Sequence, residues 1–260
     1  RAFVKIQDGC ERYCSYCIIP KARGPVRSKP LAEIRAELQN LAANGYREAV
    51  LVGINLSSYG KALGLRLIDA VEEACRVEGI ERVRLGSLEP ELLTGEDIAR
   101  MAAQKKFCPQ FHLALQSGCD KTLKAMNRHY DTAEFARIAA DIRRSFENPS
   151  LTTDVMVGFA GETEEDFLES LAFVKQMAFA KVHVFAYSRR EGTAAAKRPE
   201  QAPESVKEDR SRRMIEATEE VRRVFLMSQL GRTEEVLVET THSPLGYEGF
   251  TKNYTPVYVN

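Results

Sequence analysis

The feature that most constrains the fold is a regular alternation of short β-rich segments with amphipathic helical segments. It starts with a strand at residues 3–6, followed by a helix whose Leu31, Ile34 and Leu38 share one face. Two later helices begin at sequence caps, Thr94 with Asp97 and Thr163. Further strands are predicted at residues 49–52, 82–85, 112–115, 152–157 and 181–185, with helical segments between them.

Six such β-then-α units predict parallel strands joined by right-handed crossovers. We therefore expect an α/β fold, a partial (β/α)6 TIM-like barrel. In barrels of this kind the chemistry gathers at the C-terminal ends of the strands, where the loops that follow them meet. Side chains at those ends are the first candidates for a functional site.

The composition changes after Tyr187. Residues 188–203 are rich in charge, alanine and proline without a period, which is typical of a linker, and a long helix is predicted at 204–230. Strands are then predicted at 235–239 and, past a turn at 244–246, near 255–259. We expect three parts: a barrel at 1–203, a connecting helix at 204–230 and the start of a small, truncated β module at 231–260.

The candidate chemistry lies in Cys10, Cys14 and Cys17, a C-x3-C-x2-C run directly after the first strand. Three thiolates on a tight loop can each bind one iron of a cubane cluster and leave the fourth iron open to a substrate. A structural zinc site needs four ligands at close spacing, and no cysteine or histidine follows Cys17 until Cys75. A ferredoxin-type run would include a fourth nearby cysteine, which is absent here.

Composition limits the remaining classes of function. Lysine plus arginine equals aspartate plus glutamate at 37 each, so any contact with nucleic acid must come from local basic patches. No apolar run approaches the roughly 20 residues of a membrane span, and few cysteines are present, so we expect a cytoplasmic protein without a membrane partner. Because the chain begins at Arg1 and enters a strand at once, we expect it to be a fragment of a longer protein.

The cysteine run, with Tyr16 at its aromatic position, resembles the signature of the radical S-adenosylmethionine superfamily. The blocks Leu85 to Pro90 and Cys119 most resemble the methylthiotransferase branch that acts on carbon 2 of N6-threonylcarbamoyladenosine in tRNA. Further blocks resemble methylthiotransferase barrels over nearly the whole chain, at residues 6–10, 18–28, 53–60, 116–120, 126–128, 153–163 and 187–193.

The resemblance implies a set of cofactors and partners. The [4Fe–4S] cluster would bind S-adenosylmethionine through its open iron and cleave it to a 5′-deoxyadenosyl radical, with the protein positioning and shielding the reactants. A second [4Fe–4S] cluster is expected on an N-terminal domain that this chain does not contain. The expected partners are an electron donor and the anticodon stem-loop of tRNA, and the β module is expected to be the start of an RNA-binding TRAM domain.

Strand ends supply the candidate cofactor-binding residues. Gly53 allows close backbone approach to the methionyl group, and Tyr16 and Phe185 are candidates to sandwich its adenine, although an aromatic on a strand is more often core packing. Polar candidates that follow or end strands, each equally able to satisfy a cap or turn, are Asn55, Ser87, Glu89, Gln116, Ser117 and Asp154.

The remaining histidines and cysteines are given no functional role. The scattered histidines and the cysteines at 75, 108 and 119 are interpreted as packed or exposed residues, and no catalytic acid or base is predicted. RNA contacts are expected from two basic groups, Lys21, Arg23 and Arg27 near the cysteine loop and Arg189 and Arg190 at the barrel exit. The predicted function is tRNA methylthiolation; the rivals are a radical enzyme acting on another nucleoside or a protein, and a noncatalytic iron–sulfur sensor.

Overall fold

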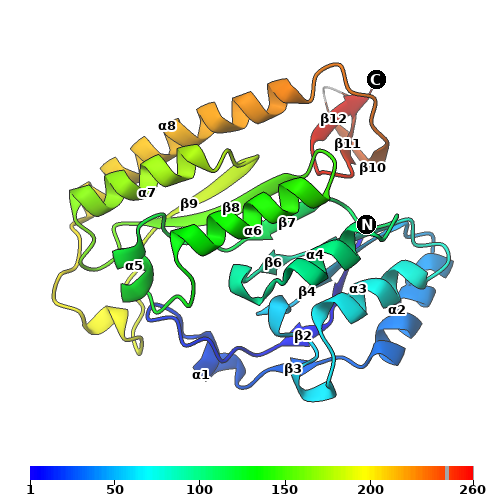
Figure 1. Cartoon of the computed structure of the whole chain (residues 1–260), viewed down its shortest axis with the longest axis horizontal. Coiled ribbons are helices and arrows are strands. Elements are labelled where there is room, and N and C mark those ends of the chain that lie inside the picture. The colour runs from blue at the N-terminus through cyan, green and yellow to red at the C-terminus, as the bar shows by residue number, and fades with distance from the viewer. Residues whose placement is uncertain (244–245, 260) are drawn as a thin grey trace.

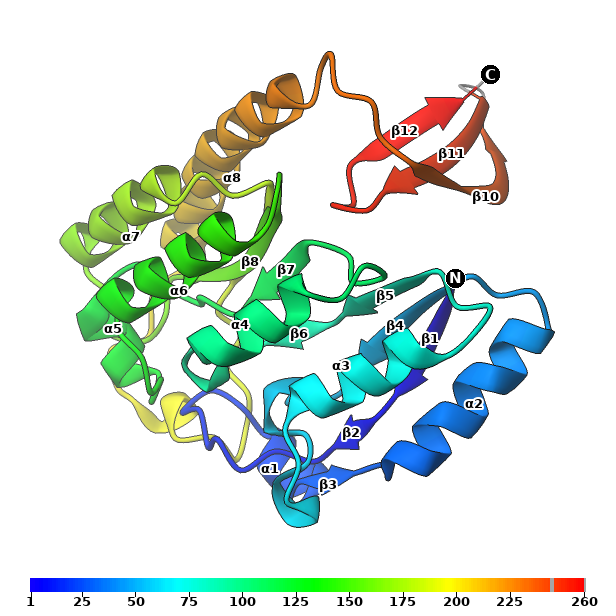
Figure 2. The same ribbon diagram turned by 45° about the vertical axis from the view of Figure 1, so that its right-hand side comes forward.

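Parallel strands form the centre of the molecule. The computed structural model describes residues 1–243 and 246–259, and its barrel strands follow one another in chain order as parallel neighbours (Figures 1 and 2). The structure confirms the predicted α/β barrel, open between its first and last strands. The strands are β1 (Ala2–Lys5), β4 (Glu48–Val52), β5 (Arg82–Leu85), β6 (Ser87–Leu88), β7 (Gln110–Leu113), β8 (Ser150–Val157) and β9 (Lys181–Ala186).

The third barrel strand is split. Its two pieces, β5 and β6, meet at Gly86 and belong to different sheets of three and four strands. The Gly86 amide still donates to the Leu51 carbonyl at 2.9 Å, which keeps the strand beside β4. Counted as one strand, the two pieces give the six strands that the sequence predicts.

Helices cover the outer face of the strands, as Figure 1 shows. The predicted caps are confirmed: the hydroxyls of Thr94 and Thr163 accept from backbone amides three residues on, in capping boxes with Asp97 and Asp166. Each such cap stabilises its helix by about 1 kcal/mol. The helices are α2 (Leu31–Ala43), α3 (Leu67–Arg76), α4 (Gly95–Ala102), α6 (Thr132–Ser145), α7 (Glu164–Gln176) and α8 (Glu204–Ser228).

One hydrophobic core lies between the strands and these helices. Alternate strand residues such as Val4, Leu51 and Val155 point outward into it and meet Leu38 and Phe135 from the helices, all fully buried. The other set of strand residues faces the inside of the barrel and is largely polar. The inner face therefore carries the side chains that are free for chemistry.

Short elements cluster at the C-terminal ends of the strands. They were not predicted, because segments of two to six residues carry too little periodicity to be recognised. Among the described residues, no helix is long and apolar enough to cross a membrane. The short elements are β2 (Gln7–Asp8), β3 (Arg27–Ser28), α1 (Ile19–Arg23), α5 (Asp120–Ala125), η1 (Leu56–Ser58), η2 (Lys61–Leu63), η3 (Pro90–Leu92) and η4 (Ala195–Lys197).

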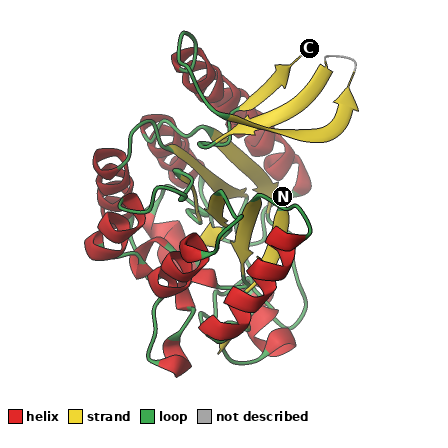
Figure 3. Ribbon diagram, turned by 90° about the vertical axis from the view of Figure 1, so that its right-hand side faces the viewer, coloured by secondary structure: helices red, strands yellow, loops and turns green. Residues whose placement is uncertain are grey.

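A three-stranded antiparallel sheet ends the chain. The sequence predicted β10 (Val236–Ser243) and β12 (Pro256–Val259) approximately but missed β11 (Gly246–Thr251), whose two glycines argue against a strand. Of the predicted turn, Pro244 and Leu245 lie outside the described residues. Figure 3 shows this sheet beyond the barrel, next to the chain's beginning.

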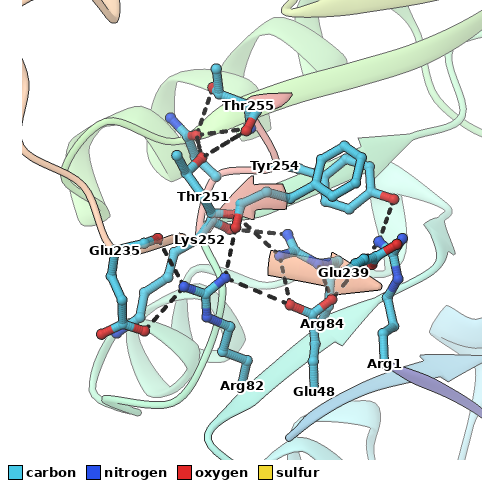
Figure 4. Close-up of polar contacts among 12 residues, drawn as sticks. Arg1, Glu48, Arg82, Arg84, Glu235, Glu239, Thr251, Lys252, Tyr254 and Thr255 are labelled. Carbon is cyan, nitrogen blue, oxygen red and sulfur yellow. Dashed lines mark hydrogen bonds and ion pairs between the residues drawn. The ribbon is translucent and has the colours of Figure 1, made fainter. Parts of the chain in front are cut away.

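The sheet docks on the N-terminal ends of the barrel strands through buried charges (Figure 4). Glu48 begins β4, and its carboxylate lies 3.3 Å from the Arg84 guanidinium of β5. Arg82 and Arg84 donate to the carbonyls of Phe250 and Lys252 at 2.9 and 3.0 Å. We call these three side chains the far-pole cluster, since they lie at the opposite end of the strands from the cysteine loop.

Candidate functional site

The three cysteines lie on one loop between β2 and α1. The loop turns sharply at Gly9, whose φ of +77° places a hypothetical Cβ 1.9 Å from the Pro25 carbonyl oxygen, so only glycine fits. Cys17 donates its backbone amide to the Cys14 carbonyl at 2.9 Å. All three thiols are free and half-exposed, and burial raises the pKa of Cys10 and Cys17.

Segments distant in the sequence are hydrogen-bonded to this loop. The Ser15 amide and hydroxyl donate to the carbonyls of Met126 and Ala125, both at 2.9 Å. The Asn127 side chain donates to the Tyr13 carbonyl at 3.0 Å, and the Ala195 amide donates to the Ser15 carbonyl at 2.7 Å. The loop is therefore positioned by the turn after α5 and by the segment leaving the barrel.

Arg128 connects the loop to the barrel interior, and sequence reasoning missed its role. Its guanidinium is buried and donates to Cys14 Sγ at 3.2 Å and to the hydroxyl of Tyr130 at 3.1 Å. It also pairs with the Glu89 carboxylate. A guanidinium beside a thiolate ligand stabilises negative charge on the sulfur and fixes the direction in which the thiolate points.

The thiols suit a cluster better than a single ion. Among residues 1–243 and 246–259, no three cysteine, histidine, aspartate or glutamate side chains converge closely enough to hold one metal ion. A cubane does not require that convergence, because each thiolate binds a different iron. The arrangement therefore argues against the zinc alternative.

A cavity of about 370 Å³ opens beside the cysteine loop. Residues of the loop itself, Glu11 and Arg12, line it together with Asn55 and Tyr59 from the segment after β4. Asn55 is buried, yet neither of its amide side-chain atoms has a hydrogen-bond partner in the described part of the chain. A buried amide without a partner in the chain is costly, so we expect a polar atom of a water or a ligand to meet it there.

Gly53 has a structural explanation. A Cβ there would lie 2.6 Å from Oε1 of Gln7, whose same oxygen accepts from the Asn55 backbone amide at 2.7 Å. Gly53 therefore makes room for Gln7, and Gln7 positions the backbone of Asn55. Its predicted contact with a methionyl group stays a prediction.

Of the remaining predicted polar residues, Ser117 and Gln116 serve the backbone after β7, whereas Ser87 and Glu89 lie at β6 and just after it. Ser117 is fully buried and its hydroxyl accepts from the Cys119 amide at 3.2 Å, so this side chain serves the turn. Gln116 adopts a positive φ of 67° and its backbone bridges to β8. Ser87 is exposed at the start of β6, and Glu89 meets Arg128 near the cysteine loop.

The two predicted aromatic residues occupy different environments. Tyr16 is packed edge-on against Phe159 with ring centroids 6.4 Å apart, and burial raises the pKa of its hydroxyl. Phe185 stands near the end of β9 with 53% of its surface exposed. Asp154 is bonded to His112 on the neighbouring strand, a contact between residues that the sequence did not connect.

The structure brings the two predicted basic groups together. Lys21 of α1 donates to the Gly192 carbonyl at 2.6 Å, which joins the cysteine-loop side to the barrel exit. Arg190 is close enough to Cys17 to stabilise its thiolate. Arg27 is exposed but also pairs with Asp8 at 3.4 Å. Positive charge therefore rims the opening in which the thiols lie.

A parallel barrel with three unpaired thiols on its first loop and a cavity beside them is the architecture of a cluster-dependent barrel enzyme. Residues 4–174 match the family model described as Radical SAM superfamily. The match takes in more than half of the chain, so the chain belongs to the radical S-adenosylmethionine superfamily.

Curated relatives narrow the comparison. A tRNA-2-methylthio-N(6)-dimethylallyladenosine synthase of Clostridium botulinum is 42% identical over 93% of this chain and 54% of its own length. A threonylcarbamoyladenosine tRNA methylthiotransferase, MtaB, of Chlamydia pneumoniae is 41% identical over 94% of this chain and 59% of its own. The chain therefore spans little more than half the length of these relatives.

Solved structures agree on the fold. The radical S-adenosylmethionine methyltransferase TsrM of Kitasatospora setae superposes with a TM-score of 0.63 at 16% identity, over 75% of this chain and 35% of that one. Coproporphyrinogen III oxidase of Escherichia coli gives 0.60 at 15% identity, over 84% and 52%. At such identities the likeness shows the barrel fold alone.

The cofactors of this superfamily, a [4Fe–4S] cluster and S-adenosylmethionine, fit the residues present. Cys10, Cys14 and Cys17 are free and would supply three thiolates, which would leave one iron open. The unpartnered amide of Asn55 and the adjoining cavity suit a polar cosubstrate beside the loop. The fit thus rests on the donor set and on an orphaned buried side chain.

Proposed function

We propose that this chain is the catalytic barrel of a cytoplasmic tRNA methylthiotransferase that acts on carbon 2 of N6-threonylcarbamoyladenosine. The observation that carries the proposal is the loop with three free thiols, which has Lys21 and Arg190 nearby and whose residues Glu11 and Arg12 line a cavity. Similarity of about 41–42% to two tRNA methylthiotransferases supports the reaction class.

In this proposal the protein's side chains bind, orient and shield. Cys10, Cys14 and Cys17 hold the cluster, Arg128 fixes the Cys14 thiolate, and Asn55 contacts the cosubstrate in the cavity. When bound, the cluster and S-adenosylmethionine supply a 5′-deoxyadenosyl radical able to remove hydrogen from unactivated carbon. An electron donor must reduce the cluster, and the half-exposed loop leaves it accessible to one.

The choice of nucleoside rests on the blocks Leu85 to Pro90 and Cys119. A second candidate, dimethylallyladenosine, is favoured by the names of several curated relatives at 42% identity. Nucleoside analysis of tRNA from a strain lacking the gene separates the two. We expect loss of 2-methylthio-N6-threonylcarbamoyladenosine; loss of the dimethylallyl derivative alone would transfer the assignment to the second candidate, and retention of both would refute the function.

A noncatalytic sensor is the rival from another class. A sensor would bind the cluster without consuming the cosubstrate, so the reconstituted chain with a chemical reductant should discriminate. We expect release of 5′-deoxyadenosine. A chain that binds both cofactors yet releases none would be a sensor.

A further inference from the structure

The inner face of β7, β8 and β9 carries a row of polar and aromatic side chains, two of which, Asp154 and Phe185, the sequence suggested as cofactor contacts. The three strands are parallel neighbours, and their register places His112 opposite Thr152 and Asp154 opposite His183. Phe185 comes next along β9, opposite Met156. The intervening residues of β9, Val182 and Val184, pack against the core, so the row faces the barrel interior.

Within this row one imidazole orients a carboxylate. His112 Nε2 lies 3.2 Å from an Asp154 carboxylate oxygen, and its Nδ1 lies 3.0 Å from the Thr152 hydroxyl. Both ring nitrogens are therefore engaged, which fixes the ring and with it the carboxylate. The Asp154 side chain remains 30% exposed, so it stays open to a ligand on the inner face.

A second imidazole completes the polar part. The His183 ring centroid lies 5.9 Å from that of His112. Burial, reinforced by the positive charge of Lys181, lowers the pKa of His183, so this ring is neutral near pH 7 and can donate through one nitrogen. A fixed carboxylate acceptor thus lies beside a neutral donor.

Phe185 provides the apolar part. Its residue is more than half exposed, whereas Val184 before it packs against the core, so core packing does not explain it. It lies near the C-terminal end of β9, on the side of the barrel where the cysteine loop is attached (Figure 1). An exposed ring next to paired donors and acceptors matches the way proteins hold an unstacked nucleobase.

We propose that Phe185, His183 and the Asp154–His112 pair form the binding site for the target base of the RNA. Phe185 stacks on the base, Asp154 accepts from an exocyclic amine, and His183 donates to a ring nitrogen. An adenine edge supplies both partners. This inference rests on the proposed function, because it identifies which residues of the barrel read the substrate.

The rival role for Phe185 is a sandwich of the cosubstrate's adenine with Tyr16. Tyr16 packs instead against Phe159 and lies near Arg128, within the cysteine-loop network. Phe185 is paired in register with Met156, which packs against the same small cluster as Tyr16, so position alone does not decide between the two roles. The two roles predict different ligands lost on substitution.

The test uses the chain reconstituted anaerobically with its cluster and S-adenosylmethionine. It is titrated into anticodon stem-loop RNAs in which 8-vinyladenosine, a fluorescent analogue that keeps the 6-amino group and whose fluorescence falls on stacking, replaces one loop adenosine at a time. We expect one probe to be quenched. Phe185→Leu should abolish that quenching and weaken RNA affinity by about tenfold. Phe185→Tyr should restore both, and Tyr46→Leu, an exposed aromatic control at the other pole, should change neither.

The edge contact has its own test. In competition assays, replacing the quenched adenosine by purine riboside removes the exocyclic amine and should weaken binding to the unmodified chain. Asp154→Ala should bind both RNAs equally, because alanine has no acceptor and the contact is already lost. Additive losses from the two changes would exclude Asp154 as the acceptor.

Two outcomes overturn the inference. If Phe185→Leu keeps the quenching, or if it loses S-adenosylmethionine affinity together with the quenching, the assignment of Phe185 to the RNA base is overturned, although the proposed function stands if the deletion strain lacks the nucleoside. If the unmodified chain binds no RNA probe and the strain keeps its methylthiolated nucleosides, both proposals fail together.

Discussion

The two ends of the barrel differ in whether their polar side chains have partners within the chain. At the far pole Glu48, Arg82 and Arg84 are buried, and each charge is paired or donates to a carbonyl of the C-terminal sheet (Figure 4). At the cysteine pole the thiols are half-exposed and the buried Asn55 amide has no partner in the described residues. The satisfied pole holds the molecule together, and the unsatisfied pole is left ready for ligands.

The interface between the C-terminal sheet and the barrel contains further ring and hydrogen-bond contacts. Phe250 and Tyr254 stack at 4.4 Å, and the Arg84 guanidinium lies over the Tyr254 ring at 4.7 Å. The Asn253 side chain donates a hydrogen bond to the Asn148 carbonyl, and the Asn253 carbonyl accepts one from the Ser150 hydroxyl. Barrel enzymes commonly divide their ends in this way, with chemistry at the C-terminal ends of the strands and stability at the other.

The largest expected effect is at the cysteine pole. Cys14→Ala removes one of three cluster ligands, so the reconstituted chain should lose the cluster's spectrum and all 5′-deoxyadenosine release. The matched control is Cys75→Ala, a buried cysteine of α3, which should keep about four irons per chain. Iron analysis and chromatography measure both. Cleavage retained by Cys14→Ala would contradict the assignment.

The next effect separates the poles. Glu48→Gln leaves two buried guanidinium groups without their carboxylate, so the free energy of unfolding should fall by about 3–5 kcal/mol. Cofactor cleavage by the folded protein should persist. Glu239→Gln, which alters a partly exposed pair with Arg1, should cost less than about 1 kcal/mol. If both variants lose the same free energy of unfolding in urea, the far-pole cluster contributes no more to stability than the partly exposed pair.

A smaller effect concerns the basic rim. Replacing Arg23 and Arg189 by Gln should flatten the slope of log RNA affinity against log salt by about one to two units, at about 0.9 per duplex phosphate contact. Arg212 and Arg223 are the matched control, because both already pair with acids on α8. An unchanged slope for the rim variant would remove these arginines from the RNA interface.

The smallest effect is electronic. Arg128→Met withdraws a positive charge and a hydrogen bond from Cys14, so the cluster's reduction potential should become more negative by about 50 mV, on the scale of 59 mV per tenfold change for one electron. Arg128→Lys keeps the charge and should shift it less. Anaerobic redox titration followed by electron paramagnetic resonance measures the shift. A potential unmoved in both variants would show that Arg128 does not act on the cluster and serves only its contacts with Glu89 and Tyr130.

The sequence predicted what depends on local pattern. Alternating apolar residues located the barrel strands, capping residues located helix starts, and cysteine spacing indicated the cluster. Period-two alternation also carries a signal for the inner face that the prediction did not use. His183 lies between Val182 and Val184, which indicates that its side chain faces away from the core. That signal alone does not say which strands are neighbours.

The rest depends on contacts between distant parts of the chain. Arg82 reaches Phe250 and Arg128 reaches Cys14 across more than a hundred residues, and neither pairing leaves a local pattern. His112 and Asp154 meet only because β7 and β8 pair in one register. Long-range pairing of charged side chains is the information that a single sequence does not display.

The most direct test of the central claim is anaerobic reconstitution of the chain with iron and sulfide, followed by Mössbauer spectroscopy with and without S-adenosylmethionine. The account predicts one [4Fe–4S] cluster per chain in which a single iron changes its signal when the cosubstrate is added, because Cys10, Cys14 and Cys17 bind only three irons. Stoichiometric zinc without iron, or a cluster whose four irons all ignore the cosubstrate, would contradict it.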